Sequence, residues 1–249
     1  MTSPPLAVEL RQVSKSFGDR RVLDNVSLSV PAGRSLCILG RSGTGKSVTL
    51  KHIAGLIKPD AGQVFAEGVD ITAMTSRALT RVRRRMGFLF QNAALFDSIS
   101  VGENVAFPLR RHSDLSARAI GDRVRELLAS VGLEREFDKM PADLSGGMRK
   151  RAGLARAMAL EPAILLADEP SAGLDPVTAA EIDDLLGRLK QTAGTTLVVV
   201  THNIPSARRI GDELAFIEAG RLLAMGPASV LDGSDHPLVR EFMTSVGAG

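Results

Sequence analysis

The stretch from Gly40 to Ser47, GRSGTGKS, constrains this chain more than any other. It matches G-x-x-x-x-G-K-[ST], a pattern in which the backbone amides of a glycine-rich loop bind the phosphates of a nucleotide. The apolar run 36–39 before it has the length of a strand, and residues 48–55 after it have a helical pattern. Strand, loop and helix in this order are the context that the motif requires. The sequence therefore predicts an α/β fold with a triphosphate site at the end of a strand.

Each part of this loop has a chemical task. A triphosphate carries about three to four negative charges, so backbone N–H groups and the positive end of a helix must assist the single lysine. We expect Gly40, Gly43 and Gly45 to let the backbone wrap closely around the phosphates. We expect Lys46 to reach the β- and γ-phosphates and Ser47 to bind Mg²⁺. The remaining loop residues that we assign to nucleotide binding are Arg41, Ser42 and Thr44.

Composition excludes some classes of partner. The chain has 249 residues, 44% of them hydrophobic and 24% charged, which suits a globular protein with a sizeable core. A net charge of +3, with nine Phe but no Trp or Tyr, gives little attraction for nucleic acid and few platforms for base stacking. We therefore expect no nucleic-acid partner.

The sequence also bears on the cellular compartment. The single cysteine, Cys37, lies in the strand before the loop, and we interpret it as a core residue in a reducing compartment. Residues 1–10 lack the basic and apolar regions of a signal peptide, and no apolar window approaches the roughly 18 residues of a bilayer span. The prediction is a cytosolic protein, or one held at a membrane by another subunit.

Two carboxylates follow a second apolar strand. The run 163–167 ends in Asp168 and Glu169, so both acids fall at the carboxyl end of a buried parallel strand. Asp168 suits Mg²⁺, and Glu169 suits the general base that takes a proton from an attacking water. Acids are also common where strands enter solvent, but the glycine-rich loop upstream favours the catalytic interpretation.

Other polar or aromatic residues fall where ligands bind in α/β sheets. His202 follows the strand 195–201, and its imidazole suits a hydrogen bond to a γ-phosphate. Gln91 follows the strand 86–90 and either contacts the ligand or is an ordinary surface glutamine. Phe17, in the first predicted turn, either stacks on the base of a nucleotide or is an ordinary loop aromatic, and its context leaves the two interpretations equally open.

Further patterns complete the secondary-structure prediction. Ser145, Gly146 and Gly147 precede a helix at 148–160 and form a second anion-ready helix start, although the same residues also begin ordinary helices. The helix 76–85 is rich in arginine, and we interpret it first as a helix with a solvated face. Contact with a membrane surface or an acidic partner is the less favoured interpretation. Other predicted strands are 6–13, 21–30, 63–66, 214–218 and 221–225, and other predicted helices are 46–58, 101–109, 117–131, 177–190, 228–231 and 237–246.

Taken in order, these motifs resemble those of the ATP-binding subunits of ATP-binding cassette (ABC) transporters. The resemblance covers nearly the whole chain and implies one ABC ATPase domain over residues 1–249. It implies a RecA-like P-loop NTPase lobe, an N-terminal antiparallel β subdomain, an inserted helical subdomain at about 92–160 and a helical tail at about 236–249. The cofactors implied are ATP and Mg²⁺.

The family resemblance also implies a mechanism. Two copies pair head to tail, so that each ATP lies on the loop of one copy and faces Ser145, Gly146 and Gly147 of the other. Asp175 links the two sites across the interface, Gln91 contacts Mg²⁺ or the attacking water, and His202 holds the γ-phosphate and orients Glu169. Phe17 matches the adenine-stacking aromatic of the family. Met148 departs from the family, because most members have glutamine there.

A narrower resemblance concerns the substrate. The segments 90–98, 103–110 and 236–240 resemble ATPases of bacterial phospholipid transporters of the Mla/Mce type, which maintain lipid asymmetry. This implies a peripheral subunit on the cytoplasmic face of the inner membrane, with an integral membrane permease, an Mce-type substrate-binding protein and a small regulatory subunit as partners. Alternatives are an ABC importer for another solute and a soluble ABC ATPase of DNA repair or translation. A P-loop kinase or GTPase does not account for the later motifs.

Overall fold

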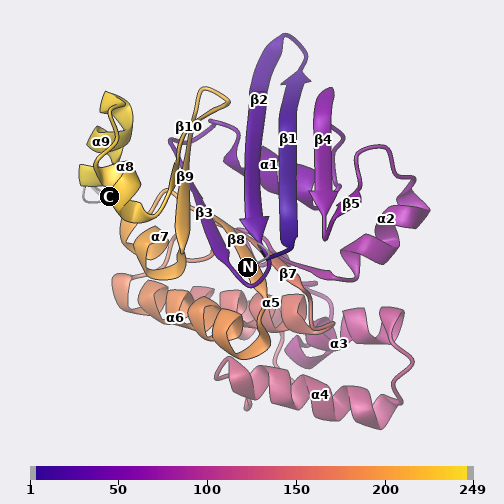
Figure 1. Ribbon diagram of the computed structural model, residues 1–249. Helices are drawn as coiled ribbons and strands as arrows, with labels where there is room; N and C mark the ends of the chain where they lie inside the picture. Colours follow the sequence, from indigo (N-terminus) through magenta and orange to yellow (C-terminus); the bar gives the residue numbers. More distant parts are fainter. Residues whose placement is uncertain (1–3, 246–249) are drawn as a thin grey trace.

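A six-stranded sheet runs through the middle of the molecule, whose computed structural model describes residues 4–245 (Figure 1). The strand order is β10-β9-β3-β8-β7-β6. The strands are β3 (Ser35–Leu39), β6 (Met86–Leu89), β7 (Ile164–Asp168), β8 (Thr196–Val200), β9 (Glu213–Glu218) and β10 (Arg221–Gly226). All neighbours pair in parallel except β9 and β10, which form an antiparallel hairpin. Because β3 and β8 are buried along their whole length, they read as continuous apolar runs.

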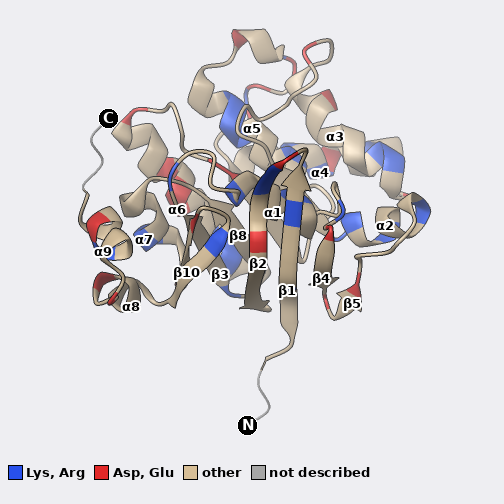
Figure 2. Ribbon diagram, turned by 90° about the horizontal axis from the view of Figure 1, so that it is seen from above, with Lys and Arg blue, Asp and Glu red and all other residues tan. Residues whose placement is uncertain are grey.

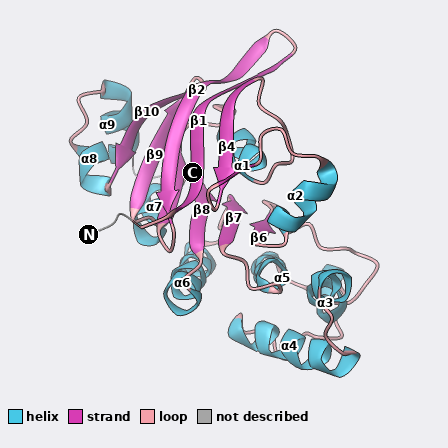
Figure 3. Cartoon of the chain, turned by 45° about the vertical axis from the view of Figure 1, so that its right-hand side comes forward, coloured by secondary structure: helices cyan, strands magenta, loops and turns pink. Residues whose placement is uncertain are grey.

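A second, antiparallel sheet packs beside the first (Figure 3). Its order is β2-β1-β4-β5. The strands are β1 (Leu6–Phe17), β2 (Arg20–Pro31), β4 (Ala61–Ala66) and β5 (Val69–Asp70). The prediction ended the first strand at Val13, but β1 continues to Phe17 because it pairs with β2 up to the turn at Gly18, where φ is +58°. The two-residue strand β5 was not predicted.

Helices cover the remaining surfaces. Those that pack around the sheets are α1 (Lys46–Ile53), α2 (Ser76–Arg83), α6 (Pro176–Ala193), α7 (Ile204–Ile210), α8 (Ala228–Asp232) and α9 (Pro237–Thr244). A group at one end of the molecule contains α3 (Val101–His112), α4 (Ala117–Ser130), the 3₁₀ helix Pro141–Asp143 and α5 (Gly146–Met158) (Figure 1). None of the helices within residues 4–245 has the length and apolar character to cross a bilayer.

Two hydrophobic cores hold these layers together. Leu10, Leu36 and Leu50 belong to a core that joins the antiparallel sheet and α1 to one face of the six-stranded sheet. Leu154 and Leu186 belong to the other core, between the opposite face of that sheet and the helices. The six-stranded sheet is thus buried on both faces, and its carboxyl edge carries the loops after β3, β6, β7 and β8. The predicted α/β P-loop fold is confirmed.

Several element ends differ from the predictions. The first helix ends at Ile53 rather than near Lys58, because Gly55 takes a left-handed conformation (φ +63°) and its N–H bonds back to His52. The helix predicted from Met148 begins at Gly146, since the side chain of Ser145 caps it. Helix α7 was missed, and the final predicted helix ends at Thr244; its last predicted residue, 246, lies outside the described residues.

Candidate functional site

The glycine-rich loop joins β3 to α1, and tight packing explains its glycines. Gly40 has φ +151°, and a Cβ there would lie 2.1 Å from the carbonyl oxygen of Ile217 in β9. Gly45 has φ +106°, and its Cβ would lie 2.7 Å from both Leu23 and Val22 in β2. Any larger residue at these positions would push the loop away from both sheets.

Lys46 is folded over this loop. Its Nζ donates to the carbonyl oxygens of Gly40 and Arg41, both at 2.8 Å. Desolvation lowers the pKa of Lys46, whereas the nearby charges of Glu169 and Asp168 raise it. The side chain is buried, so the loop encloses a largely desolvated ammonium beside backbone amides. Such a group attracts a phosphate strongly.

Ser47 and Asp168 meet at the start of α1 and the end of β7. The Ser47 hydroxyl donates to Oδ1 of Asp168 at 2.9 Å. Burial raises the pKa of Asp168, and the Ser47 hydrogen bond opposes that rise. A hydroxyl beside a carboxylate fits Mg²⁺, which takes few protein oxygens and keeps water and phosphate as its other ligands. The residues present therefore suit the predicted metal.

Glu169 is fixed by its backbone and paired through its side chain. It takes a left-handed conformation (φ +49°), and its N–H donates to the carbonyl of Val200 at 2.8 Å. Oε1 of Glu169 lies 2.9 Å from Nδ1 of His202. The Glu169 side chain is 12% exposed and that of His202 is 61% exposed. The two predicted catalytic residues are thus in contact, with the imidazole on the solvent side.

Two basic residues that the sequence analysis did not assign to the site also contact it. Lys150, buried on α5, donates from Nζ to the carbonyl oxygen of Glu169 at 2.9 Å. Arg20, at the start of β2, donates to the carbonyl oxygen of Gly43 at 3.3 Å. Lys150 follows the Ser-Gly-Gly segment by one helical turn, which is the only sequence signal that could have identified it.

Gln91 and Phe17 lie at the edges of the site. Leu89 pairs with Ala167 in the parallel register of β6 and β7, so Gln91 follows β6 at the same sheet edge as Glu169. Gln91 is exposed and makes no side-chain hydrogen bond within residues 4–245. Phe17 is 50% exposed at the end of β1 and pairs with Arg20, which contacts the phosphate loop. The position of Phe17 suits a base-stacking role, which stays a prediction.

The Ser-Gly-Gly segment lies against the loop that carries Asp175. Ser145 caps α5 by accepting from Met148 N–H at 3.2 Å, and a Cβ on Gly147 would lie 2.5 Å from Thr178. Asp175 caps α6 and accepts from the Thr178 hydroxyl at 2.6 Å. Among the described residues, Ser145 makes no hydrogen bond to the phosphate loop, and both Ser145 and Gly146 are exposed.

Comparison with known proteins identifies the family to which the chain is similar. The sequence profile described as "ABC transporter" matches residues 23–172. The chain is similar to the probable ribonucleotide transport ATP-binding protein mkl of Mycobacterium tuberculosis, with 44% identity over 238 residues. That match covers 96% of this chain and 66% of mkl, so the chain spans slightly less than two thirds of that relative's length.

A second relative matches at nearly full length. The intermembrane phospholipid transport system ATP-binding protein MlaF of Escherichia coli K12 is 41% identical over 242 residues, covering 97% of this chain and 90% of MlaF. Among solved structures, the dimeric post-hydrolysis state of the ATP-binding cassette MJ0796 bound to ADP and Pi superposes with a TM-score of 0.83 and 35% identity. That superposition covers 88% of this chain and 98% of the other.

Proposed function

The chain belongs to the ABC transporter family, and from this premise we propose that it binds and hydrolyses ATP to drive a membrane transporter. The observation that carries the proposal is the contact between Glu169 and His202 beside the Ser47–Asp168 pair. Ser47 comes from the start of α1, Asp168 and Glu169 from the end of β7, and His202 from the segment after β8, and the sheet brings these groups to one edge, next to the buried ammonium of Lys46. A phosphate site, a cation site and a candidate general base therefore adjoin one another.

Each residue has a task in hydrolysis. Lys46 and the loop amides balance the charge of the phosphates, and the loop glycines let those amides approach. Ser47 and Asp168 would hold Mg²⁺, which when bound neutralises charge on the β- and γ-phosphates. Glu169 accepts the proton of the attacking water, and His202 holds the carboxylate in place from the solvent side. Lys150 fixes the backbone of Glu169 by donating to its carbonyl oxygen.

We propose that the working form is a head-to-tail dimer. Ser145 and Gly146 are exposed, and within the described residues Ser145 makes no hydrogen bond to the phosphate loop of its own chain, so these residues are free to complete the site of a second copy. The dimeric form of the similar cassette MJ0796 supports this arrangement. Asp175 shapes the loop beside Ser145, which suits its predicted role at the interface.

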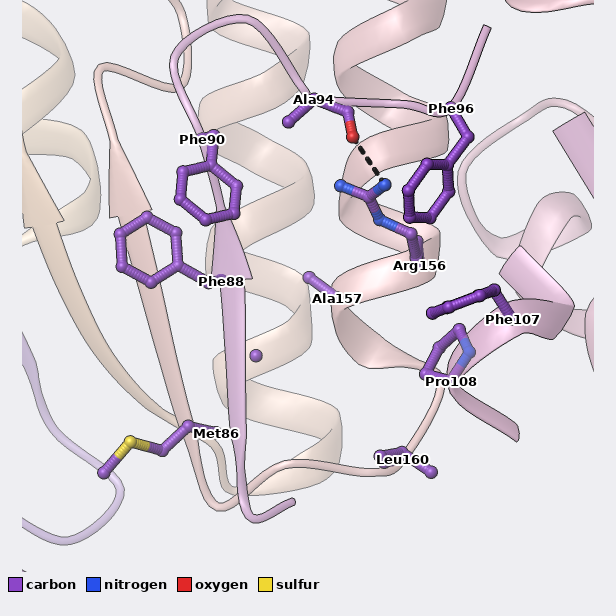
Figure 4. Close-up of a pocket in the computed structure, with 11 residues that line it drawn as sticks. Met86, Phe88, Phe90, Ala94, Phe96, Phe107, Pro108, Arg156, Ala157 and Leu160 are labelled. Atoms are coloured by element: carbon purple, nitrogen blue, oxygen red, sulfur yellow. Dashed lines mark hydrogen bonds between the residues drawn. The ribbon is translucent and has the colours of Figure 1, made fainter. Parts of the chain in front are cut away.

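An apolar groove suits the docking of a permease. The groove has a volume of about 330 Å³ and lies between β6, the following loop, α3 and α5 (Figure 4). Phe88 stacks on Phe90 at 4.1 Å between ring centroids, and Phe96 lies 5.0 Å from Phe107. Arg156 holds the loop by donating to the carbonyl of Ala94 at 2.7 Å. Phe90, Phe96 and Phe107 remain 37–46% exposed, as expected of a surface that another subunit covers.

The substrate that we propose is phospholipid moved between the inner and outer membranes. The supporting observation is the similarity to MlaF over nearly the full length of both proteins. The complex would lie on the cytoplasmic face of the inner membrane, with a permease, an Mce-type protein and a small regulatory subunit. The alternative is another solute, since mkl is described as a probable ribonucleotide transport ATP-binding protein.

Copurification with an integral membrane permease tests the docking proposal. Phe107→Asp places a charge in the groove and should release the permease while ATP binding by the isolated chain stays unchanged. Val230→Asp is the matched control, since Val230 is 51% exposed on α8, outside the groove. Equal loss of the permease from both variants, or from neither, would contradict the assignment of the groove.

Lipid transfer tests the substrate. The purified complex, placed between donor and acceptor vesicles, should move labelled phospholipid only with ATP and not when Glu169 is replaced by Gln. ATP-driven uptake of ribonucleotide without phospholipid transfer would instead favour the alternative solute.

A further inference from the structure

Three arginines lie on one face of α2 and its C-terminal cap. Arg77 and Arg81 are in the helix, and Arg84 is the C-cap residue that follows it. Their spacings of four and three residues place the three side chains in one row along the helix. All three are exposed, whereas Leu79 on the other side of the helix is buried. We call Arg77, Arg81 and Arg84 the α2 basic face. Figure 2 shows the blue residues of α2 on the side of the molecule away from α6 to α9.

The neighbouring arginines are used differently. Arg83 turns inward and donates to the carbonyl oxygens of Ala54 and Gly55 at 3.0 and 2.6 Å. Arg85 forms an ion pair with Glu67. Within residues 4–245, by contrast, no member of the α2 basic face lies within 4.0 Å of a carboxylate. The positive charge of the α2 basic face therefore has no acidic partner among the described residues. Elsewhere on the surface, many arginines pair with acidic residues.

The positive surface continues onto the end of α3. Nε of Arg84 donates to Nδ1 of His112 at 3.3 Å, and the exposed Arg111 precedes that histidine. Arg110 is also exposed, but it lies 4.0 Å from the carboxylate of Glu103. Burial, together with the charges of Arg84 and Arg111, lowers the pKa of His112, which favours the neutral imidazole that can accept this hydrogen bond. The α2 basic face and the end of α3 thus form one cationic surface.

This cationic surface adjoins the groove that we assign to the permease. Met86, two residues after Arg84, lines the groove, and so do Phe107 and Pro108, one turn before Arg111. A permease helix seated in the groove would therefore bring the membrane surface toward the arginines. This step rests on the proposed function.

We propose that the α2 basic face and the end of α3 bind anionic phospholipid headgroups of the membrane that surrounds the permease. A headgroup phosphate matches the planar donor geometry of guanidinium. Helix α2 has one exposed apolar residue, the small Ala78, whereas protein interfaces have an apolar centre. A membrane surface needs no such centre, because long cationic side chains can each find a phosphate.

Flotation of the purified full-length chain with vesicles tests the proposal without any permease. The chain should bind phosphatidylcholine vesicles that contain phosphatidylglycerol, should not bind pure phosphatidylcholine, and should be released by salt. The triple variant Arg77→Gln, Arg81→Gln, Arg84→Gln should lower the partition coefficient on the order of a hundredfold, as expected for three basic residues near an anionic surface.

The matched control removes the same charge elsewhere. Arg125→Gln, Arg135→Gln and Arg188→Gln change exposed arginines of α4, the loop after it and α6, and should retain most of the binding. ATP hydrolysis by both triple variants should equal that of the unmodified chain, which shows that they fold. If both triple variants lost vesicle binding equally, net charge rather than the α2 basic face would explain the binding, and the proposal would be overturned.

Other outcomes also decide the question. If the chain ignores anionic vesicles but the α2 triple variant loses its permease, the surface binds an acidic protein segment and the lipid proposal is wrong. If vesicle binding follows the α2 basic face but no permease copurifies with the unmodified chain, the lipid surface stands and the proposed transporter role fails instead.

Discussion

Oε1 of Glu169 lies 2.9 Å from Nδ1 of His202, although 32 residues separate the two in the sequence. The parallel pairing of β7 and β8 creates this contact, since each residue follows the carboxyl end of its strand. The backbone of Glu169 is also held on two sides, by Val200 and by Lys150. The carboxylate is therefore held in position before a nucleotide binds, as a general base requires.

Replacing Glu169 by Gln should separate binding from hydrolysis. The amide keeps the size of the side chain but cannot accept the proton of the attacking water, so hydrolysis should slow by roughly two to four decades. ATP affinity should stay unchanged, as measured by titration with a fluorescent nucleotide analogue. Near-normal turnover of the variant would remove Glu169 from its catalytic role.

Replacing Ser145 by Arg should abolish hydrolysis without weakening nucleotide binding by the single chain. Ser145 is exposed and bonds only within its own helix start, so a bulky cation there would act on the opposite copy. A loss of ATP affinity in the isolated variant would contradict the head-to-tail arrangement.

Mixing two inactive variants sharpens this test. Ser145→Arg chains combined with Lys46→Ala chains should recover part of the activity, because a mixed dimer contains one intact composite site. If the Ser-Gly-Gly segment served its own chain instead, neither copy in the mixture would be whole and no activity would return.

Two glycine-to-alanine changes should have opposite effects. Gly40→Ala places a methyl group 2.1 Å from the carbonyl oxygen of Ile217, so the loop must shift and ATP binding should be lost. Gly187→Ala, in the interior of α6 where the new Cβ would meet no atom within 4 Å apart from its own helix backbone, should raise stability by about 0.5–1 kcal/mol. Denaturant unfolding and nucleotide titration measure the two outcomes. If both variants bound ATP equally well and had the same stability, close packing would not explain why Gly40 must be a glycine.

Asp183→Asn should stabilise the protein at neutral and alkaline pH. Asp183 on α6 is 4% exposed, and its Oδ1 has no hydrogen-bond partner within residues 4–245. Burial raises the pKa of this carboxyl above 3.8. As pH rises above 3.8, the unfolded chain therefore loses its proton first, and the folded protein loses stability until its own carboxyl ionises. Asparagine cannot ionise and avoids this loss.

Thermal unfolding across a pH series measures the effect. The advantage of the Asp183→Asn variant should be absent below pH 3.8, should grow as pH increases above it, and should level off once the folded carboxyl has ionised. Asp184→Asn is the matched control, because Asp184 is paired with Arg209 at 2.7 Å and removing its charge should not stabilise the fold. A gain that does not depend on pH would mean that ionisation of Asp183 is not its cause.

The fold class could be predicted because its signals are local. An apolar strand followed by GRSGTGKS and a helix leaves few alternatives, and Asp168 and Glu169 after a second apolar run place the carboxylates at the same sheet edge. Ser145, Asp175 and His202 were likewise found from short segments and their order. Such motifs depend on the backbone conformation of neighbouring residues, which a sequence pattern encodes directly.

Local sequence patterns were enough to predict the α/β class, the phosphate loop and the residues placed at the strand ends. The contacts of Lys150 with Glu169 and of Arg20 with the phosphate loop, and the burial of Asp183, became visible only in the folded chain. The structure also shows that the arginines of one segment have different contacts: Arg83 faces inward, Arg85 pairs with Glu67, and the α2 basic face has no acidic partner among the described residues. These features depend on contacts between residues distant in the chain, and no local pattern specifies which distant partner a charged side chain meets.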